Sequence, residues 1–242
     1  MFKHFLRICK EKLIDQHGYW ANQRSDLKIE EIFRAIMKYG YLVKWQKAAK
    51  CPCIPTEGSE QPDFNCALCH GKGHVWSDPL TIRGIMTNFN ENQKYNQTGE
   101  MVMGVSYFTT LPQYRVNFWD RITNFHSQIR YDEVKAHGEH GGTDKLRFKP
   151  IQIVSVRTLE TVYENGVDYI LDKNVGVSWV PGGQEPPTGE RVSISYLMHP
   201  SWIVMDLTNV IRDTYVKSKK PGITFQQLPQ RATVKLEYFV WA

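Results

Sequence analysis

Four of the five cysteines of this chain lie within nineteen residues, and they constrain it more than any other sequence feature. They form two pairs, Cys51-Pro-Cys53 and Cys66-Ala-Leu-Cys69. Residues 70–73, His-Gly-Lys-Gly, follow the second pair, and their glycines permit positive φ, which turns backbone N–H groups toward the sulfurs. We therefore predict a structural zinc ion held by four thiolates, those of Cys51, Cys53, Cys66 and Cys69.

Two disulfides or four free thiols are the alternatives to a metal. A bond between Cys51 and Cys53 would close a small, strained ring, which disfavours that disulfide. Because His70 and His74 are close in sequence, a set of three cysteines and one histidine also stays open. The segment 54–65 has few large apolar residues and cannot bury enough surface to order itself. We therefore interpret the metal as a cross-link, or staple, that orders this loop.

Composition limits the class of protein. Among 242 residues, 41% are hydrophobic and 12% aromatic, which is enough for a packed core and excludes global disorder. The net charge of +5 comes from scattered basic residues, a pattern more typical of a solvated surface than of a nucleic-acid footprint. No apolar run approaches the roughly 20 residues that cross a bilayer. The charged N-terminus does not resemble a signal peptide, and with the unpaired Cys9 this favours assembly in a reducing cytoplasm.

Helical periodicity is confined to the N-terminal part of the chain. Residues 2–15 predict a short helix, and residues 27–46 predict a longer one that Asp26 can cap. The longer segment carries an apolar stripe with the i, i+3, i+4, i+7 spacing of a helix. This stripe runs through Ile29, Ile32, Phe33, Ile36, Met37 and Gly40 and continues through Tyr41, Val43 and Trp45.

From Thr81 onward, short alternating apolar runs separated by turn residues predict β-strands. Asn165-Gly166 predicts a hairpin turn, whereas residues 206–216 fit either strand or helix. The predicted strands are 80–86, 101–109, 114–118, 125–131, 151–159, 169–171, 175–179, 192–196, 202–204 and 232–241.

The predicted fold is mainly β with an N-terminal helical segment. It comprises an antiparallel β-barrel, a second β-rich, sandwich-like domain and a zinc-stapled loop insertion. We expect the domains to be residues 1–50 (helices), 51–76 (cysteine-rich metal-binding insertion), 77–160 (β-barrel) and 161–242 (C-terminal β-rich domain).

Catalytic motifs are absent from the sequence, which contains no G-x-S-x-G elbow, H-E-x-x-H pair or nucleotide-binding glycine loop. His137, His140 and Asp144 suggest a metal-dependent hydrolase, but their spacing fits no ligand pattern, and the glycines between them favour a mobile loop. Asp120, followed by Arg121, is better explained as a turn-locking ion pair or backbone cap than as a proton donor. We therefore predict that the protein is not an enzyme.

Two segments carry a family resemblance. Residues 99–122, GEMVMGVSYFTTLPQYRVNFWDRI, are similar to the β-barrel of tailed-bacteriophage head-completion and head–tail adaptor proteins. Residues 163–196 contain, in order, Gly-Val-Asp-Tyr, a strand with a tryptophan, a proline turn and a strand that runs from Gly-Glu to a tyrosine. This order resembles a sequence pattern common in phage virion proteins. The cysteine loop also looks like insertions in neck and collar proteins.

The resemblance implies a structural subunit of a phage virion neck that forms a homo-oligomeric ring at the head–tail joint, as a head-completion, adaptor or collar protein. Its partners would be further copies of itself, the portal and other neck and tail proteins, with passing contact to packaged DNA and none to a membrane. It would be found in the virion, after assembly in the bacterial cytoplasm. A zinc-stabilised nucleic-acid-binding protein is the alternative, based on the basic charge and the cysteine pattern.

Overall fold

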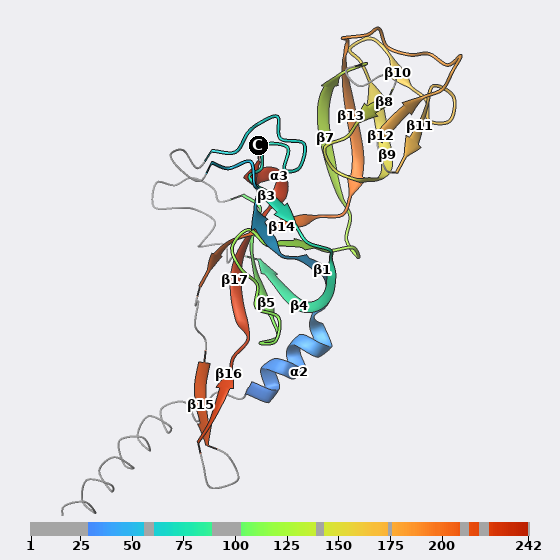
Figure 1. The fold of residues 1–242 in the computed structure, drawn as a ribbon. Helices are drawn as coiled ribbons and strands as arrows, with labels where there is room; N and C mark the ends of the chain where they lie inside the picture. The colour runs from blue at the N-terminus through green and yellow to red at the C-terminus, as the bar shows by residue number, and fades with distance from the viewer. Residues whose placement is uncertain are drawn as a thin grey trace, which may run out of the picture. The chain divides into compact units, whose positions relative to one another are not determined.

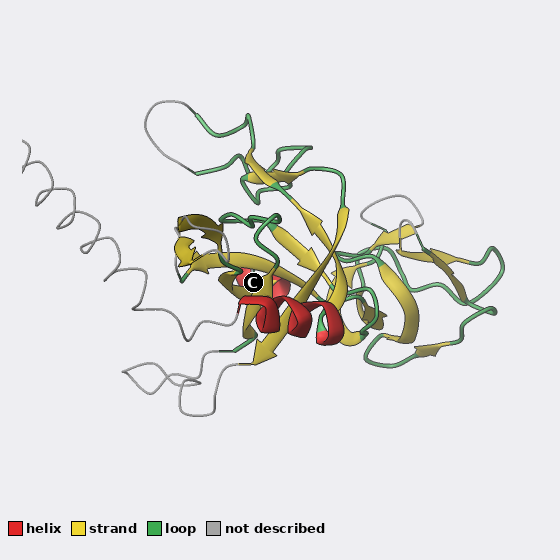
Figure 2. Cartoon of the chain, turned by 90° about the horizontal axis from the view of Figure 1, so that it is seen from below, coloured by secondary structure: helices red, strands yellow, loops and turns green. Residues whose placement is uncertain are grey.

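The structure is a computed structural model that describes residues 29–55, 61–88, 103–138, 143–173, 176–208, 213–217 and 223–241. Most of the described chain is strand or connecting loop (Figure 2), which confirms the mainly β prediction. The helix expected at residues 2–15 lies outside the described residues. Among the helices that the structure describes, none has the length and apolar character needed to cross a membrane.

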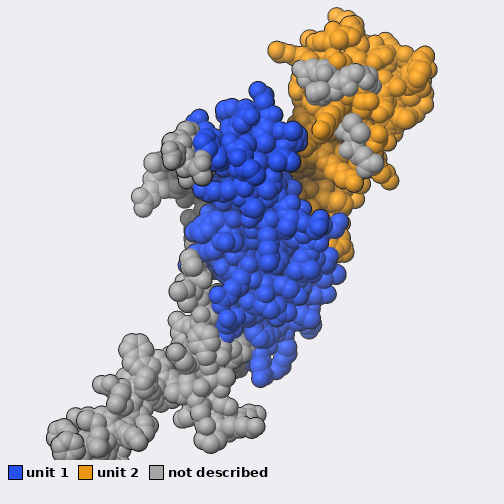
Figure 3. Space-filling model, in the orientation of Figure 1, with its two compact units in different colours: residues 1–122, 203–242 blue, residues 123–202 orange. Residues whose placement is uncertain are grey.

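The chain divides into two compact units (Figure 3). Unit 1 consists of residues 1–122 and 203–242, and unit 2 consists of residues 123–202. These limits do not coincide with the expected boundaries after residues 50, 76 and 160, because strands from both ends of the chain join in unit 1.

Unit 1 contains a closed, six-stranded antiparallel β-barrel (Figure 1). Its strands, in order around the barrel, are β1 (Tyr41–Gln46), β4 (Leu80–Asn88), β5 (Val105–Thr110), β17 (Gln230–Leu236), β14 (Ser201–Leu207) and β6 (Arg121–Thr123). Alternate side chains are buried on β5 and β17, as expected for a small barrel filled by its own residues. The core includes Val43, Ile82, Phe108, Ile122, Ile203 and Val234.

Helix α2 (Ile29–Tyr39) is shorter than predicted, because the chain changes from helix to strand at Gly40. The Gly40 N–H still donates to the Ile36 carbonyl at 2.9 Å, and a Cβ at position 40 would clash with that carbonyl. Residues 41–46 form β1, in which Val43 and Trp45 point into the barrel. The prediction of helix through residue 46 was wrong, since these positions satisfy the two-residue period of a strand as well.

Gly84 gives β4 the space to pass a buried aromatic ring. A Cβ at this position would clash with the ring of Phe108, which is fully buried. We expect Gly84→Ala to lower the free energy of unfolding by about 1–3 kcal/mol through overpacking, as measured by urea denaturation. Thr81→Ala, an exposed change on the same strand, should alter it by less than about 0.5 kcal/mol. Equal stability of the two variants would contradict this explanation.

Unit 2 is built from two sheets, which confirms a second β-rich, sandwich-like part. Trp179 lies between the sheets, with its ring centroid 5.0 Å from that of Tyr163 in an edge-to-face arrangement. One sheet has the order β10 (Val162–Tyr163), β9 (Pro150–Arg157), β13 (Arg191–Met198) and β7 (Ile129–Ala136). The other has the order β11 (Tyr169–Asp172), β12 (Gly176–Trp179) and β8 (Thr143–Lys145).

Glu133 on β7 should make the stability of unit 2 depend on pH. Burial raises the pKa of its carboxyl group, which accepts hydrogen bonds from the Arg147 N–H (3.1 Å) and the Tyr196 hydroxyl (3.3 Å). The folded state therefore holds this proton more tightly, and stability falls as pH rises from about 4.5 through the raised value. We expect Glu133→Gln, which keeps the acceptor, to be more stable than the wild type at pH 7. Urea denaturation of the variant and the wild type at pH 4 and pH 7 tests this. If the variant were the more stable protein at pH 4 but not at pH 7, folding would lower the pKa of Glu133 instead of raising it.

Other predicted elements also differ from the structure. Residues 114–118 are irregular, although Val116 is buried. The turn at Asn165-Gly166 joins β10 to β11, but these pair with β9 and β12 rather than with each other, so the predicted hairpin does not form. The last predicted strand, 232–241, ends at Leu236 and gives way to the helical turn α3 (Glu237–Val240).

Two short strand pairs complete unit 1. In the ambiguous region 206–216, residues from Asp213 are strand, and β15 (Asp213–Lys217) pairs with β16 (Ile223–Gln227) in a separate two-stranded sheet. The second pair, β2 (Ala48–Lys50) with β3 (His74–Trp76), encloses the cysteine-rich segment.

Candidate metal centre

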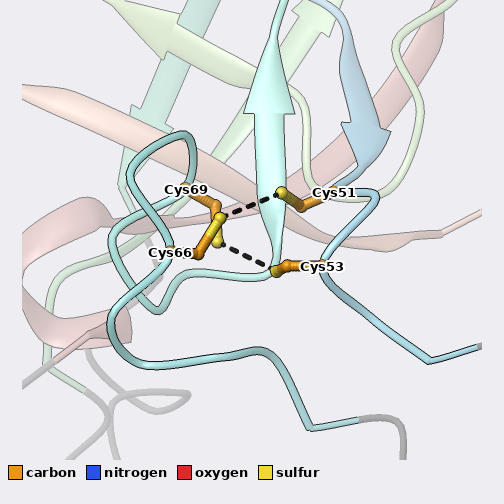
Figure 4. Close-up of side chains that lie close together, drawn as sticks. All are labelled: Cys51, Cys53, Cys66 and Cys69. Carbon is orange, nitrogen blue, oxygen red and sulfur yellow. Dashed lines mark hydrogen bonds between the residues drawn. The ribbon is translucent and has the colours of Figure 1, made fainter.

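The four cysteines lie at one end of the β2–β3 hairpin (Figure 4). Cys51 directly follows β2, and its N–H donates to the Gly73 carbonyl at 2.9 Å, which continues the hairpin beyond the last strand pair. Cys66 and Cys69 belong to the turns that lead into β3. The side chains of all four cysteines point toward one another.

The turn after Cys66 has the tight backbone that the C-x-x-C-x-G-x-G pattern predicts. The His70 N–H donates to the Cys66 carbonyl at 2.9 Å, and the Lys72 N–H donates to the Cys69 carbonyl at 3.0 Å. Three residues here have positive φ, and two of them are the predicted glycines: His70 at 49°, Gly71 at 78° and Gly73 at 73°.

The distances between sulfurs fit a shared ion. All four Sγ atoms lie within 4.8 Å of one another, with Cys51 and Cys66 separated by 3.7 Å and Cys53 and Cys69 by 3.5 Å. Four thiolates bound tetrahedrally at about 2.3 Å from a zinc ion would lie about 3.8 Å apart, whereas a disulfide requires about 2.05 Å. The four thiols are unbonded, and together they can hold a metal ion.

The protein environment shifts the pKa values of these thiols in opposite directions. The backbone N–H groups of Cys69 and Leu68 donate to the Cys66 sulfur and lower the pKa of that thiol to about 7. Burial raises the pKa of Cys53 to about 12, because a thiolate is poorly solvated there. A cation among the sulfurs would favour the thiolate form at all four positions.

The two nearby histidines do not join the described cluster of sulfur atoms. His70 is exposed, while the His74 ring stacks on Trp119 with centroids 4.6 Å apart. Burial lowers the pKa of His74, and its Nδ1 lies 3.3 Å from the Lys72 carbonyl oxygen. The geometry therefore favours four cysteines over a set of three cysteines and one histidine.

Asp120 connects the hairpin to the barrel. Its buried carboxylate accepts three hydrogen bonds of 2.8 Å, from the Trp45 indole Nε1–H and from the backbone N–H groups of Ala48 and Asn117. Asp120 is thus a backbone cap, one of the two roles expected for it. Arg121 pairs with a different carboxylate, that of Glu237.

In unit 2, the candidate hydrolase residues form a buried hydrogen-bonded group. His137 Nδ1 lies 2.9 Å from Asp144 Oδ2, which also accepts the Trp179 indole N–H at 2.8 Å. Glu185 Oε1 lies 3.0 Å from the other ring nitrogen of His137. His140 lies outside the described residues. His137 and Asp144 are 3% and 4% exposed, so they are part of the packed interior rather than of a loop tip.

Sequence reasoning missed a second set of residues next to the four-cysteine cluster. Lys72 and Arg121 both contact Glu237, which is 3% exposed at the start of α3. Lys72 lies within the cysteine pattern itself, which was the one available signal. Glu237 is 165 residues away in the sequence, and nothing local indicates this partner.

The sequence profile of one family, described as "Domain of unknown function (DUF4815)", matches residues 86–220. This is more than half of the chain and includes all of unit 2, but it excludes the four cysteines. No curated protein matches the chain. The chain therefore belongs to the family defined by this domain of unknown function, DUF4815.

Proposed function

We propose that the four-cysteine site holds a zinc ion whose role is structural. Four sulfur ligands in a closed tetrahedral arrangement are typical of structural zinc and leave no open position for a substrate. The sulfur separations of 3.5 and 3.7 Å support this choice. Zinc would hold residues 51–53 and 66–69 together and fix the end of the hairpin.

We further propose that the protein is a non-enzymatic, structural subunit of a tailed-phage neck that assembles into a ring at the head–tail joint of the virion. The observation that carries this proposal is that the segment resembling connector barrels, residues 99–122, contributes β5 and β6 to a closed barrel. In such a subunit the barrel would be the rigid body, and the zinc hairpin would be a contact element held by the metal.

Ring assembly needs a heterologous interface that repeats until it closes. The separate β15–β16 sheet supports this requirement, because among the described strands neither of its two outer edges is paired, and a two-stranded sheet is marginally stable by itself in water. Pairing of one of these edges with a strand of a neighbouring copy would satisfy its backbone groups.

Native mass spectrometry of the purified protein, alone and mixed with portal and tail-completion proteins, tests the assembly. We expect a closed multiple of the 28.2 kDa chain, formed by itself or on a partner ring. A protein that stays monomeric at every concentration and binds no virion component would contradict the proposal.

A zinc-stabilised nucleic-acid-binding protein is the second candidate. One observation favours it: Lys44, Lys47 and Lys50 are all exposed along the path from β1 to the metal centre. Binding to duplex and single-stranded DNA at increasing salt distinguishes the two functions. A log–log slope of several units would support this candidate, and no binding at low salt would exclude it.

A further inference from the structure

Residues 237–241 are held against the β2–β3 hairpin, which carries the four cysteines, through one buried carboxylate. Glu237 Oε1 accepts from Arg121 Nη2 at 2.6 Å and from Lys72 Nζ at 3.1 Å. The Glu237 side chain is 4% exposed, while those of its two cationic partners are 22% (Lys72) and 20% (Arg121). A carboxylate buried to this degree depends on its partners, since losing one leaves charge that water does not stabilise.

One of these partners belongs to the turn that presents the metal ligands. Lys72 lies between Cys69 and Gly73, and its N–H is bonded to the Cys69 carbonyl. The same turn therefore carries both the Cys69 sulfur and the Lys72 side chain. Loosening of this turn would weaken the contact of Lys72 with Glu237.

Aromatic contacts connect the same two parts of the chain. The Arg121 guanidinium lies 3.7 Å from the ring centroid of Trp76 on β3, in a cation–π arrangement. The Trp119 ring stacks on His74 of the hairpin on one side, at 4.6 Å, and on Trp241 at 5.7 Å. Residues 237–241 thus contact the hairpin through an ion pair and, by way of Trp119, through a ring stack.

We propose that metal binding and docking of residues 237–241 are thermodynamically coupled, with the contact between Lys72 and Glu237 as the principal link. This inference rests on the proposed metal site. In the metal-bound protein the C-terminal turn is docked; when the ion is removed, the turn at residues 66–73 loosens and residues 237–241 detach.

Coupling is reciprocal: docking of residues 237–241 must raise the affinity for the metal by the same factor as the metal raises the equilibrium constant for docking. A substitution that weakens docking should therefore also weaken metal binding. We expect Glu237→Gln and Lys72→Gln each to weaken zinc binding by about tenfold, although neither changes a ligand. Arg34→Gln, which removes an exposed ion pair with Glu30 on α2, is the control and should leave the affinity unchanged. Competition with a chromophoric chelator measures the affinities.

Hydrogen exchange gives the second readout. We expect the amides of residues 237–241 in the wild-type protein to lose protection when zinc is chelated, while those of β13 in unit 2 keep theirs. Wild-type affinity in both the Glu237 and Lys72 variants, with unchanged protection at 237–241 after chelation, would overturn the coupling and leave the metal site intact. Absence of zinc binding by the wild type would overturn both. If Glu237→Gln fails to fold, Lys72→Gln with the exchange experiment decides.

Discussion

Replacing Cys69 by serine is expected to weaken zinc binding by at least about 100-fold. Structural zinc sites bind with about 10–16 kcal/mol at neutral pH, and a thiolate is one of four contributors to that energy. Cys69 is 2% exposed and lies 3.5 Å from the Cys53 sulfur, so a hydroxyl group at this position would leave the ion with three thiolates. Native mass spectrometry and chelator competition measure the change.

The fifth cysteine provides the matched control. Cys9→Ser removes a thiol outside the four-cysteine set and should leave zinc content and affinity unaltered. Cys51→Ser should behave like the Cys69 variant, because Cys51 is equally buried and lies 3.7 Å from Cys66. Full zinc occupancy in both the Cys51 and Cys69 variants would show that these sulfurs are not ligands.

The second large effect is expected at Asp120, where alanine should cost unit 1 about 3–5 kcal/mol of stability. The substitution leaves three N–H donors without the acceptor that each now contacts at 2.8 Å, among them the indole of the buried Trp45. It also disconnects Ala48 at the start of the hairpin from the barrel. Hydrogen exchange of β1 and β4 amides in urea reports the stability of unit 1 separately.

Two aspartate variants bracket this effect. Asp120→Asn keeps one acceptor oxygen and should cost about 1–2 kcal/mol. Asp78→Ala changes an exposed aspartate of unit 1, and it should alter the stability of that unit by less than about 0.5 kcal/mol. If Asp120→Ala is no worse than Asp78→Ala, the three hydrogen bonds contribute little to the fold.

The four-cysteine cluster was predictable because its constraints are local. The spacing of Cys66 and Cys69 and the glycines that follow determine one tight turn, and the turn determines where two sulfurs point. The mainly β architecture was predictable for a similar reason, since alternation within each strand is local. The end of α2 was not, because Tyr41, Val43 and Trp45 satisfy both a helical stripe and a strand.

What sequence reasoning missed depends on long-range pairing. Asp120 contacts Trp45 across 75 positions, and Lys72 contacts Glu237 across 165. The barrel is closed by β17, which pairs with β5 from the middle of the chain. Within a single sequence no signal connects such positions, so the barrel expected at 77–160 left out β1, β14 and β17. His137 and Asp144 were misread for a related reason, because glycines between them suggested a tip, whereas the partner Trp179 lies on another strand.

X-ray absorption at the zinc edge of the purified wild-type protein shows directly whether the four cysteines hold a zinc ion. We predict one zinc ion per chain with four sulfur neighbours at about 2.3 Å and no oxygen neighbour. A metal-free protein with four titratable thiols, or a zinc ion bound mainly by oxygen or nitrogen, would contradict it.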